Sequence, residues 1–328
     1  MPFQPGLCAV VTLPEVVLVT PSPKHAQEHV PSGLFRSSSF RLSGCIASAP
    51  TRRAKKMTTT TDRSELLDAL TEGISKLTTS DEWQRYLDCQ SRFYHYSSNN
   101  VMLILTQHHE ATQVAGFNAW KKLGRFVQKG EKAIWIVAPM RYRVANDEKN
   151  DDEQQVIRGF KWVPVFDISS TDGEELPSVC NKLAGDDPDG LFDRLTAMAD
   201  SIGFHVESVE IPSGANGDCT YSEKRIRVEV TNAPAQRVKT LAHELAHALL
   251  HENFKDRKLA ELEAESTAFV ICKVLGIDSS DYSFGYVANW AGGGEQAIAG
   301  ITASCQNIQK AAATILGHFE VGDQEVAA

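Results

Sequence analysis

The segment LAHELAHALLH at 241–251 carries the residues best suited to chemistry: His243, Glu244 and His247, spaced as HExxH. On a helix, residues four apart lie on one face, about one turn from each other. Two imidazoles so placed bind one ion, with Zn–N distances of about 2.0–2.1 Å. Glu244 is then placed to take a proton from a metal-bound water. We predict His243 and His247 as zinc ligands and Glu244 as the general base; the alternative is a pair of hydrogen-bonded core histidines.

The residues around this motif predict a buried helix. Asn232 is a suitable N-cap and Pro234 suits the first turn. The helix is apolar on almost every side, through Leu241, Ala242, Leu245, Ala246, Ala248, Leu249 and Leu250. Because unpaired polar groups are costly in an apolar interior, two histidines and a glutamate there need a partner such as a metal ion.

A catalytic zinc ion has three protein ligands and one open position, so a third ligand is needed. The next predicted helix, 257–275, offers Glu261, Glu263 and Glu265. Glu261 and Glu265 share one face and Glu263 takes the other, so spacing leaves the choice open. His251, one turn beyond the motif, either supports a ligand or packs in the core; we interpret it as a core residue.

The oxyanion of a hydrolytic reaction needs a hydrogen-bond donor. Tyr282, Tyr286 and Trp290 follow at four-residue spacing. Tyr286 is our candidate donor, and the alternative is that the three rings are an aromatic packing stripe.

Charge is unevenly distributed over the 328 residues, although the net charge is −9. Residues 116–143 hold seven basic residues and one acidic residue, whereas 146–328 hold fifteen and thirty-one. The first half is therefore the part suited to phosphate contact. Aromatic rings stack on bases while cations follow the backbone of a single strand. The candidates are Tyr94, Tyr96, Asn99, Asn100, Trp120, Lys121, Lys122, Arg125, Lys129 and Lys132. The alternative is core aromatics and solvated lysines.

The patterns predict an α+β protein of two domains. We expect a disordered tail or mis-assigned start at 1–57, a nucleic-acid-binding domain at 58–170, a linker at 171–187 and a metal domain at 188–328. Predicted helices are 64–77, 81–93, 99–108, 188–201, 282–291 and 295–317, with strands at 133–138 and 156–168 and a hairpin of 204–211 with 219–230. Seven cysteines without a C-x-x-C pair favour a reducing compartment, and no apolar run approaches ~20 residues. We expect a cytoplasmic protein without membrane contact.

Two resemblances extend these predictions. HELAH followed by a helix with Glu-Ala resembles ImmA/IrrE-like zincin metallopeptidases, which implies one Zn²⁺, an unidentified protein or peptide substrate, and Glu263 before Ala264 as third ligand. Glu265, the second choice, stands where that group usually has Asn.

The strings YHYSSNNVMLILTQ, GFNAWKKLGRFVQKGEKAIWIVAP and FKWVPVFDIS are similar to the N-terminal domain of ArdC-type antirestriction proteins. That resemblance implies single-stranded DNA binding ahead of a zincin-like domain, and protection of incoming mobile-element DNA. The alternatives are a single-stranded-DNA-binding protein with a structural zinc site, and a regulatory peptidase that cleaves a repressor.

Overall fold

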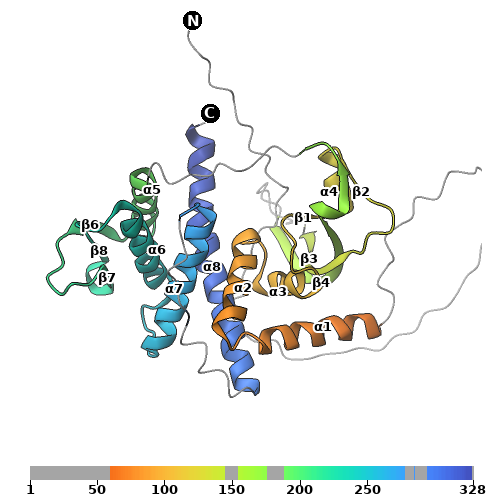
Figure 1. Ribbon diagram of the computed structural model, residues 1–328, viewed down its shortest axis with the longest axis horizontal. Helices are drawn as coiled ribbons and strands as arrows, with labels where there is room; N and C mark the ends of the chain where they lie inside the picture. Colours follow the sequence, from red (N-terminus) through yellow and green to blue (C-terminus); the bar gives the residue numbers. More distant parts are fainter. Residues whose placement is uncertain (1–59, 145–153, 176–187, 278–283, 285–293, 327–328) are drawn as a thin grey trace, which may run out of the picture.

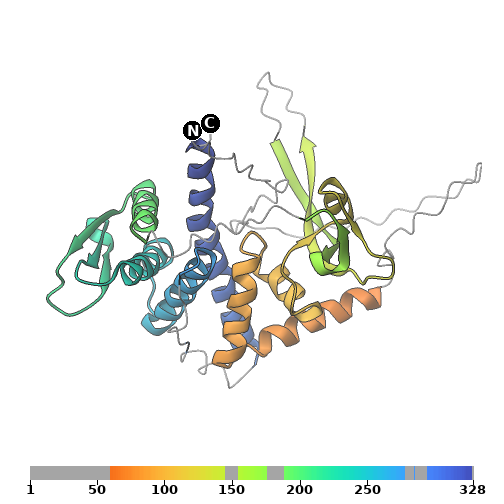
Figure 2. The same ribbon diagram turned by 45° about the horizontal axis from the view of Figure 1, so that its top comes forward.

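The computed structural model describes residues 60–144, 154–175, 188–277, 284 and 294–326. It has a mixed α+β fold, with helices gathered between two separate groups of strands (Figures 1 and 2). Outside these residues lie the predicted tail 1–57, most of the linker 171–187, and the predicted helix 282–291 apart from residue 284, including Tyr282, Tyr286 and Trp290.

Three helices begin the described chain: α1 (Thr60–Ser75), α2 (Ser80–Arg92) and α3 (Ser98–Gln107). Their positions match the predicted helices, because each carries apolar residues at helical spacing. The α3 N-cap is Ser97, whose side chain accepts a hydrogen bond from the Asn100 amide. The helix therefore begins at Ser98, one residue before the predicted 99–108.

The first group of strands is centred on an antiparallel hairpin of β3 (Ile134–Val144) and β4 (Gln154–Asp167), which overlap the strands predicted at 133–138 and 156–168. β1 (Val114–Ala115) pairs with the end of β4. After the short α4 (Phe117–Lys122), β2 (Arg125–Val127) pairs with β5 (Thr171–Gly173), which follows the 3₁₀ turn Ile168–Ser170. Residues 171–173, expected in the linker, therefore belong to this group.

The free edge of β3 is paired by side chains of α3. The Asn100 amide donates to the Val137 carbonyl at 2.8 Å and accepts from the Val137 N–H at 2.9 Å. Gln107 makes the same two bonds with Trp135, at 2.9 Å each. These amides act as a substitute strand, because they supply the donor and acceptor that an edge strand lacks.

The second group begins with α5 (Pro188–Ser201), followed by β6 (His205–Val209), β7 (Gly217–Thr220), the 3₁₀ turn Tyr221–Glu223 and β8 (Arg225–Glu229). The strand order is β6-β8-β7. The predicted hairpin of 204–211 with 219–230 is wrong: β6 runs parallel to β8, and the antiparallel partner of β8 is β7. The 219–230 segment itself turns back at Lys224, whose φ of 48° is left-handed.

Three helices complete the chain: α6 (Pro234–Leu250), α7 (Arg257–Val274) and α8 (Glu295–Val326). α7 lies between α6, α8 and α2, and α8 continues past it to α1 and α3 (Figure 1). One buried cluster joins both halves, since Trp83 and Tyr86 of α2 pack together with Phe269 of α7 and Ile308 of α8. The indole N–H of Trp83 donates to the Ser266 hydroxyl at 2.9 Å. Within the described residues, no helix is both long enough and apolar enough to cross a membrane.

Candidate metal centre and nucleic-acid interface

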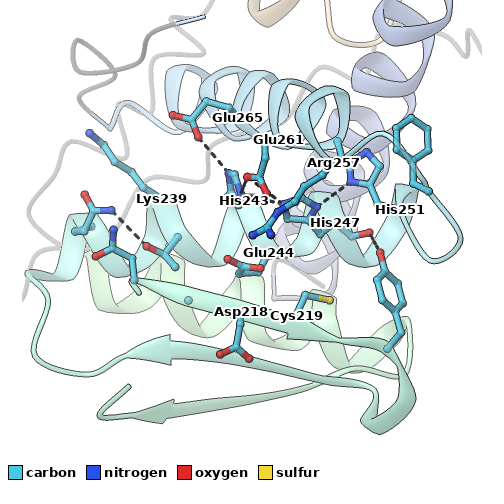
Figure 3. A pocket seen from close by; sticks show the side chains of 17 residues that line it. Asp218, Cys219, Lys239, His243, Glu244, His247, His251, Arg257, Glu261 and Glu265 are labelled. Carbon is cyan, nitrogen blue, oxygen red and sulfur yellow. Dashed lines mark hydrogen bonds and ion pairs between the residues drawn. The ribbon is translucent and has the colours of Figure 1, made fainter. Parts of the chain in front are cut away.

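The HExxH motif lies in the second half of α6. The helix begins after Ala233, with Pro234 at its first position, so the expected N-cap Asn232 is one residue too early. Pro234 suits this place because its missing N–H would have no partner there. Val238, Leu241, Ala242 and Leu245 are fully buried and fix the rotation of the helix. His243 and His247 consequently face α7, whereas Glu244 faces β7 (Figure 3).

Glu261 of α7 completes a three-residue group with the two histidines. The His243 and His247 Nε2 atoms are 3.0 Å apart, and the Glu261 Oε2 atom lies 3.4 and 3.7 Å from them. Donor atoms around a tetrahedral zinc ion with bonds of ~2.0–2.1 Å are separated by about 3.3 Å. The three atoms therefore fit one small divalent cation, and two imidazoles with a carboxylate suit zinc and related metals.

Glu265, one turn beyond Glu261, orients the first histidine. Its Oε2 atom is 3.1 Å from Nδ1 of His243, on the side of the ring opposite Nε2. Metal-binding histidines commonly donate their second N–H to a carboxylate in this way, which fixes the tautomer and the ring plane. Glu261 and Glu265 thus share the face of α7 that meets α6.

Glu263, which the resemblance implied as third ligand, points the other way. Its carboxylate is 1% exposed and accepts hydrogen bonds from the Ser304 hydroxyl at 2.6 Å and the Asn307 amide at 3.0 Å. It also lies 3.2 Å from Nε2 of His251. In this structure Glu261, and not Glu263, lies beside the histidine pair, because the packing of α7 on α8 turns Glu263 away from it.

The charges of this group support one another. Burial lowers the pKa of His243, but hydrogen bonds to Glu261 and Glu265 outweigh it and raise the pKa to about 9. Hydrogen bonds that the Glu261 carboxylate accepts from His243 and His247 hold its pKa far below its ordinary value. The pocket thus favours an ionised Glu261 carboxylate with a positive charge beside it. When the two imidazoles are neutral, a bound divalent cation would supply that positive charge.

Glu244 is buried beside the edge strand β7. Burial raises its pKa, against the lowering effect of His243 and His247. A raised carboxylate pKa suits a group that takes up and returns a proton near neutral pH. β7 approaches closely here because residue 217 is glycine: a Cβ atom would lie 2.5 Å from the Thr240 methyl and 3.1 Å from Oε1 of Glu244.

A cleft of about 750 Å³ opens over these groups and is lined by α6, α7 and β7 (Figure 3). Arg257, at the start of α7, extends into it beside His247. The sequence reasoning missed Arg257, which lies in no motif. Cys219 also lines the cleft, and burial raises the pKa of its thiol to about 12. The expected oxyanion donor, Tyr286, lies outside the described residues.

The structure separates the ten residues predicted to contact nucleic acid. The polar groups of four of them donate hydrogen bonds within the protein. The Asn100 amide donates to the Val137 carbonyl, and the Trp120 indole donates to the Phe166 carbonyl. The Tyr96 hydroxyl donates to the Val114 carbonyl, and Arg125 donates to the Thr171 hydroxyl. Asn100 and Trp120 are also buried, so in this conformation they offer no surface to a base. Tyr94 is half-buried against the core. Those left exposed are Asn99, Lys121, Lys122, Lys129 and Lys132.

One face of the β3–β4 hairpin carries aromatic rings that are not among the ten predicted residues. Trp135 pairs with Pro164, Val137 with Trp162, and Pro139 with Phe160, and paired residues lie on the same face. The opposite face, with Ile134, Ile136 and Val165, packs in the core. We call Trp135, Phe160 and Trp162 the aromatic strip.

The strip is accessible to a ligand, since Phe160 is 66% exposed and both tryptophans are half-buried. The alternation in FKWVPVFD already indicates this face, because it puts Phe160 and Trp162 on one side of the strand and Val163 and Val165 on the other. Phe117 of α4 and Phe126 of β2 are further exposed rings near the lysines, at 51% and 57%.

Comparison with known protein families assigns both halves. Residues 60–166 match the N-terminal domain of anti-restriction factor ArdC, and residues 200–272 match the IrrE N-terminal-like domain. The chain is an ArdC-type two-domain protein. Both resemblances drawn from the sequence are confirmed, and the second half of this ArdC-type chain has a metallopeptidase-like fold.

The individual relatives have low sequence identity to this chain. An uncharacterized protein of Bacillus anthracis is 26% identical over 282 residues, which are 70% of this chain and 47% of that protein. The chain thus spans about half the length of that relative. Crystal structures of the antirestriction ArdC protein from the R388 plasmid, metal-free and Mn(II)-bound, are 23% and 22% identical, with TM-scores of 0.44 and 0.43. Each covers 68% of this chain, and 85% and 84% of the respective solved chain are matched.

Proposed function

We propose that this ArdC-type protein binds one divalent ion, zinc, through His243, His247 and Glu261 and uses Glu244 to hydrolyse a peptide bond. We also propose that its first half binds single-stranded DNA and that the protein acts in antirestriction, protecting incoming mobile-element DNA. The observation that carries the metal proposal is the convergence of three donor atoms, 3.0–3.7 Å apart, beside a buried glutamate. Among the described residues this group has three protein ligands, which leaves a coordination position for water.

In the proposed reaction the residues of the chain position water and move its proton. A bound zinc ion would lower the pKa of a coordinated water to about 7 and polarise the scissile carbonyl. Glu244 takes the proton from the attacking water and delivers it to the leaving amine, which its raised pKa favours. Arg257 in the cleft is placed to stabilise developing negative charge.

Two substitutions test the metal site and the chemistry separately. Glu261→Gln should weaken zinc affinity by about 10²–10³-fold, since one of three ligands of a site worth ~10 kcal/mol is lost. Glu244→Gln should leave zinc binding within about threefold and abolish proteolysis. Metal content by mass spectrometry, zinc affinity by calorimetry and digestion of a protein library give the readouts. Bound zinc with no proteolysis by the wild type would favour a structural metal site in a DNA-binding protein; cleavage confined to repressors would favour the regulatory peptidase.

The aromatic strip supports the DNA proposal. Bases stack on exposed aromatic rings for about 1–3 kcal/mol each, while nearby cations contact phosphates. The four exposed lysines, 121, 122, 129 and 132, lie on α4 and the segment from β2 to β3 of the same half. By contrast, residues 188–328 contain eleven basic and twenty acidic residues, and this part of the chain would repel a DNA strand.

Fluorescence anisotropy with a labelled oligonucleotide tests this proposal. Phe160→Ala and Trp162→Ala should each weaken binding about 5–100-fold. Lys121→Glu with Lys122→Glu should flatten the salt dependence by about one to two phosphate contacts. The exposed Lys310→Glu on α8 is the matched control and should change neither. Salt-independent binding, or unchanged affinity in both aromatic variants, would refute the assignment.

A further inference from the structure

His251 and Glu263 are buried polar residues that the proposed hydrolysis does not use. Their side chains are 4% and 1% exposed. Nδ1 of His251 lies 2.9 Å from Nδ1 of His247, and its Nε2 lies 3.2 Å from Oε2 of Glu263. Glu263 is held in turn by Ser304 and Asn307 of α8. A continuous chain of hydrogen bonds thus runs from a proposed metal ligand on α6, through α7, to α8.

The donors and acceptors along this series of hydrogen bonds determine the tautomer of His247. The Glu263 carboxylate accepts from the Ser304 hydroxyl and from the Asn307 amide, so an ionised carboxylate also accepts from Nε2–H of His251. A neutral His251 then has a lone pair on Nδ1, which accepts from Nδ1–H of His247. His247 is left with its lone pair on Nε2, the atom 3.0 Å from Nε2 of His243 and 3.7 Å from Glu261.

We infer that His251 and Glu263 are positioning residues that hold His247 in its metal-binding tautomer and orientation. This inference rests on the proposed metal site. The two ligand histidines are held differently: Glu265 contacts His243 directly and its side chain is 38% exposed, whereas the carboxylate serving His247 is buried and acts through His251. Buried hydrogen bonds are stronger and hold geometry more tightly than exposed ones. The orientation of His247 therefore depends on the buried pair His251 and Glu263.

The role explains why a charged residue is buried between α7 and α8. A buried carboxylate is costly unless it is fully hydrogen-bonded, and Glu263 has three side-chain partners. An apolar residue there would pack as well, but it would leave Nε2–H of His251 unpaired and allow the ring to adopt the other tautomer. The ring would then present N–H to His247 and no longer accept its proton.

The test uses Zn²⁺ affinity and the Co²⁺ absorption spectrum of the full chain. His251→Phe keeps a ring of similar size, and Glu263→Gln keeps the shape but removes the charge. Each should weaken Zn²⁺ binding about 10–100-fold and alter the Co²⁺ ligand-field bands. His109→Phe is the matched control, since His109 is exposed and far from the site in sequence; its affinity and spectrum should equal those of the wild type.

Thermal unfolding of the metal-free variants separates positioning from packing. A residue that only packs would lower the melting temperature and leave the Co²⁺ spectrum unchanged, which would overturn the inference. If His251→Phe fails to fold, Glu263→Gln and Ser304→Ala decide: unchanged affinity and spectrum in both would refute it. Wild-type protein that binds no metal would overturn the proposed site together with this inference, whereas wild-type binding matched by the variants would overturn this inference alone.

Discussion

Replacing Phe269 by alanine should destabilise both halves of the protein together. Phe269 of α7 is fully buried in the cluster that also contains Trp83 and Tyr86 of α2. Its ring meets Phe284 edge to face, with centroids 5.7 Å apart. Because this position joins the two family-matched segments, we expect the chain to unfold as one cooperative unit.

The magnitude follows from burial and cavity formation. Phe→Ala in a core costs about 3–5 kcal/mol, and the lost aromatic pair adds about 0.5–1.5 kcal/mol. Against a total stability of about 5–15 kcal/mol, this is about a quarter or more. At roughly 2–4 °C per kcal/mol for a chain of this size, the melting temperature should fall by about 7–26 °C.

The assay compares two probes of urea unfolding in the presence of a chelator. Far-UV circular dichroism follows the helices of both halves. Tryptophan fluorescence in a Trp290→Phe background follows the first half, where the other four tryptophans lie: Trp83, Trp120, Trp135 and Trp162. Both midpoints should move together in Phe269→Ala. The matched control Phe160→Ala, at a position 66% exposed, should cost under about 0.5 kcal/mol. A fluorescence midpoint that stays in place while the dichroism midpoint moves would refute the shared core.

Three further predictions concern single contacts. Gly217→Ala should displace β7 from Glu244, because the new methyl group would lie 2.5 Å from the Thr240 side chain. Proteolytic turnover should fall by at least tenfold, while zinc affinity stays within about threefold. Turnover equal to that of the wild type would contradict the close approach of β7 to α6. Asn100→Ala should cost about 2 kcal/mol in urea unfolding, since two hydrogen bonds to Val137 are lost, whereas the exposed neighbour Asn99→Ala should be near neutral. Burial alone would raise the pKa of Asp167, but bonds from Ser169, Thr112 and Gln113 lower it below its ordinary value. A depressed folded pKa contributes stability above the unfolded value of about 3.9 that disappears as pH falls through the folded value. The stability difference between wild type and Asp167→Asn should therefore be largest above about pH 4 and shrink at lower pH; a constant difference would contradict this account.

The sequence alone determined the features that depend on neighbours along the chain. The helices α1 to α3 and α5 to α8 follow from apolar spacing, and the β3–β4 hairpin follows from two apolar strands around an acidic loop. His243, Glu244 and His247 could be placed on one helix because their spacing matches its period. The division into two family domains was also readable, through strings that resemble known families.

Tertiary structure decided which faces meet. Glu261 and Glu263 are two residues apart on α7, so they point to different sides, and only the rotation of α7 between α6, α8 and α2 selects Glu261. The same holds for Trp120, which looked like a stacking ring but lies under Phe166. The parallel pairing of β6 with β8 depends on a crossover that local pattern does not contain. In each case the physical reason is that periodicity defines the faces of an element, whereas packing against distant elements decides which face is buried.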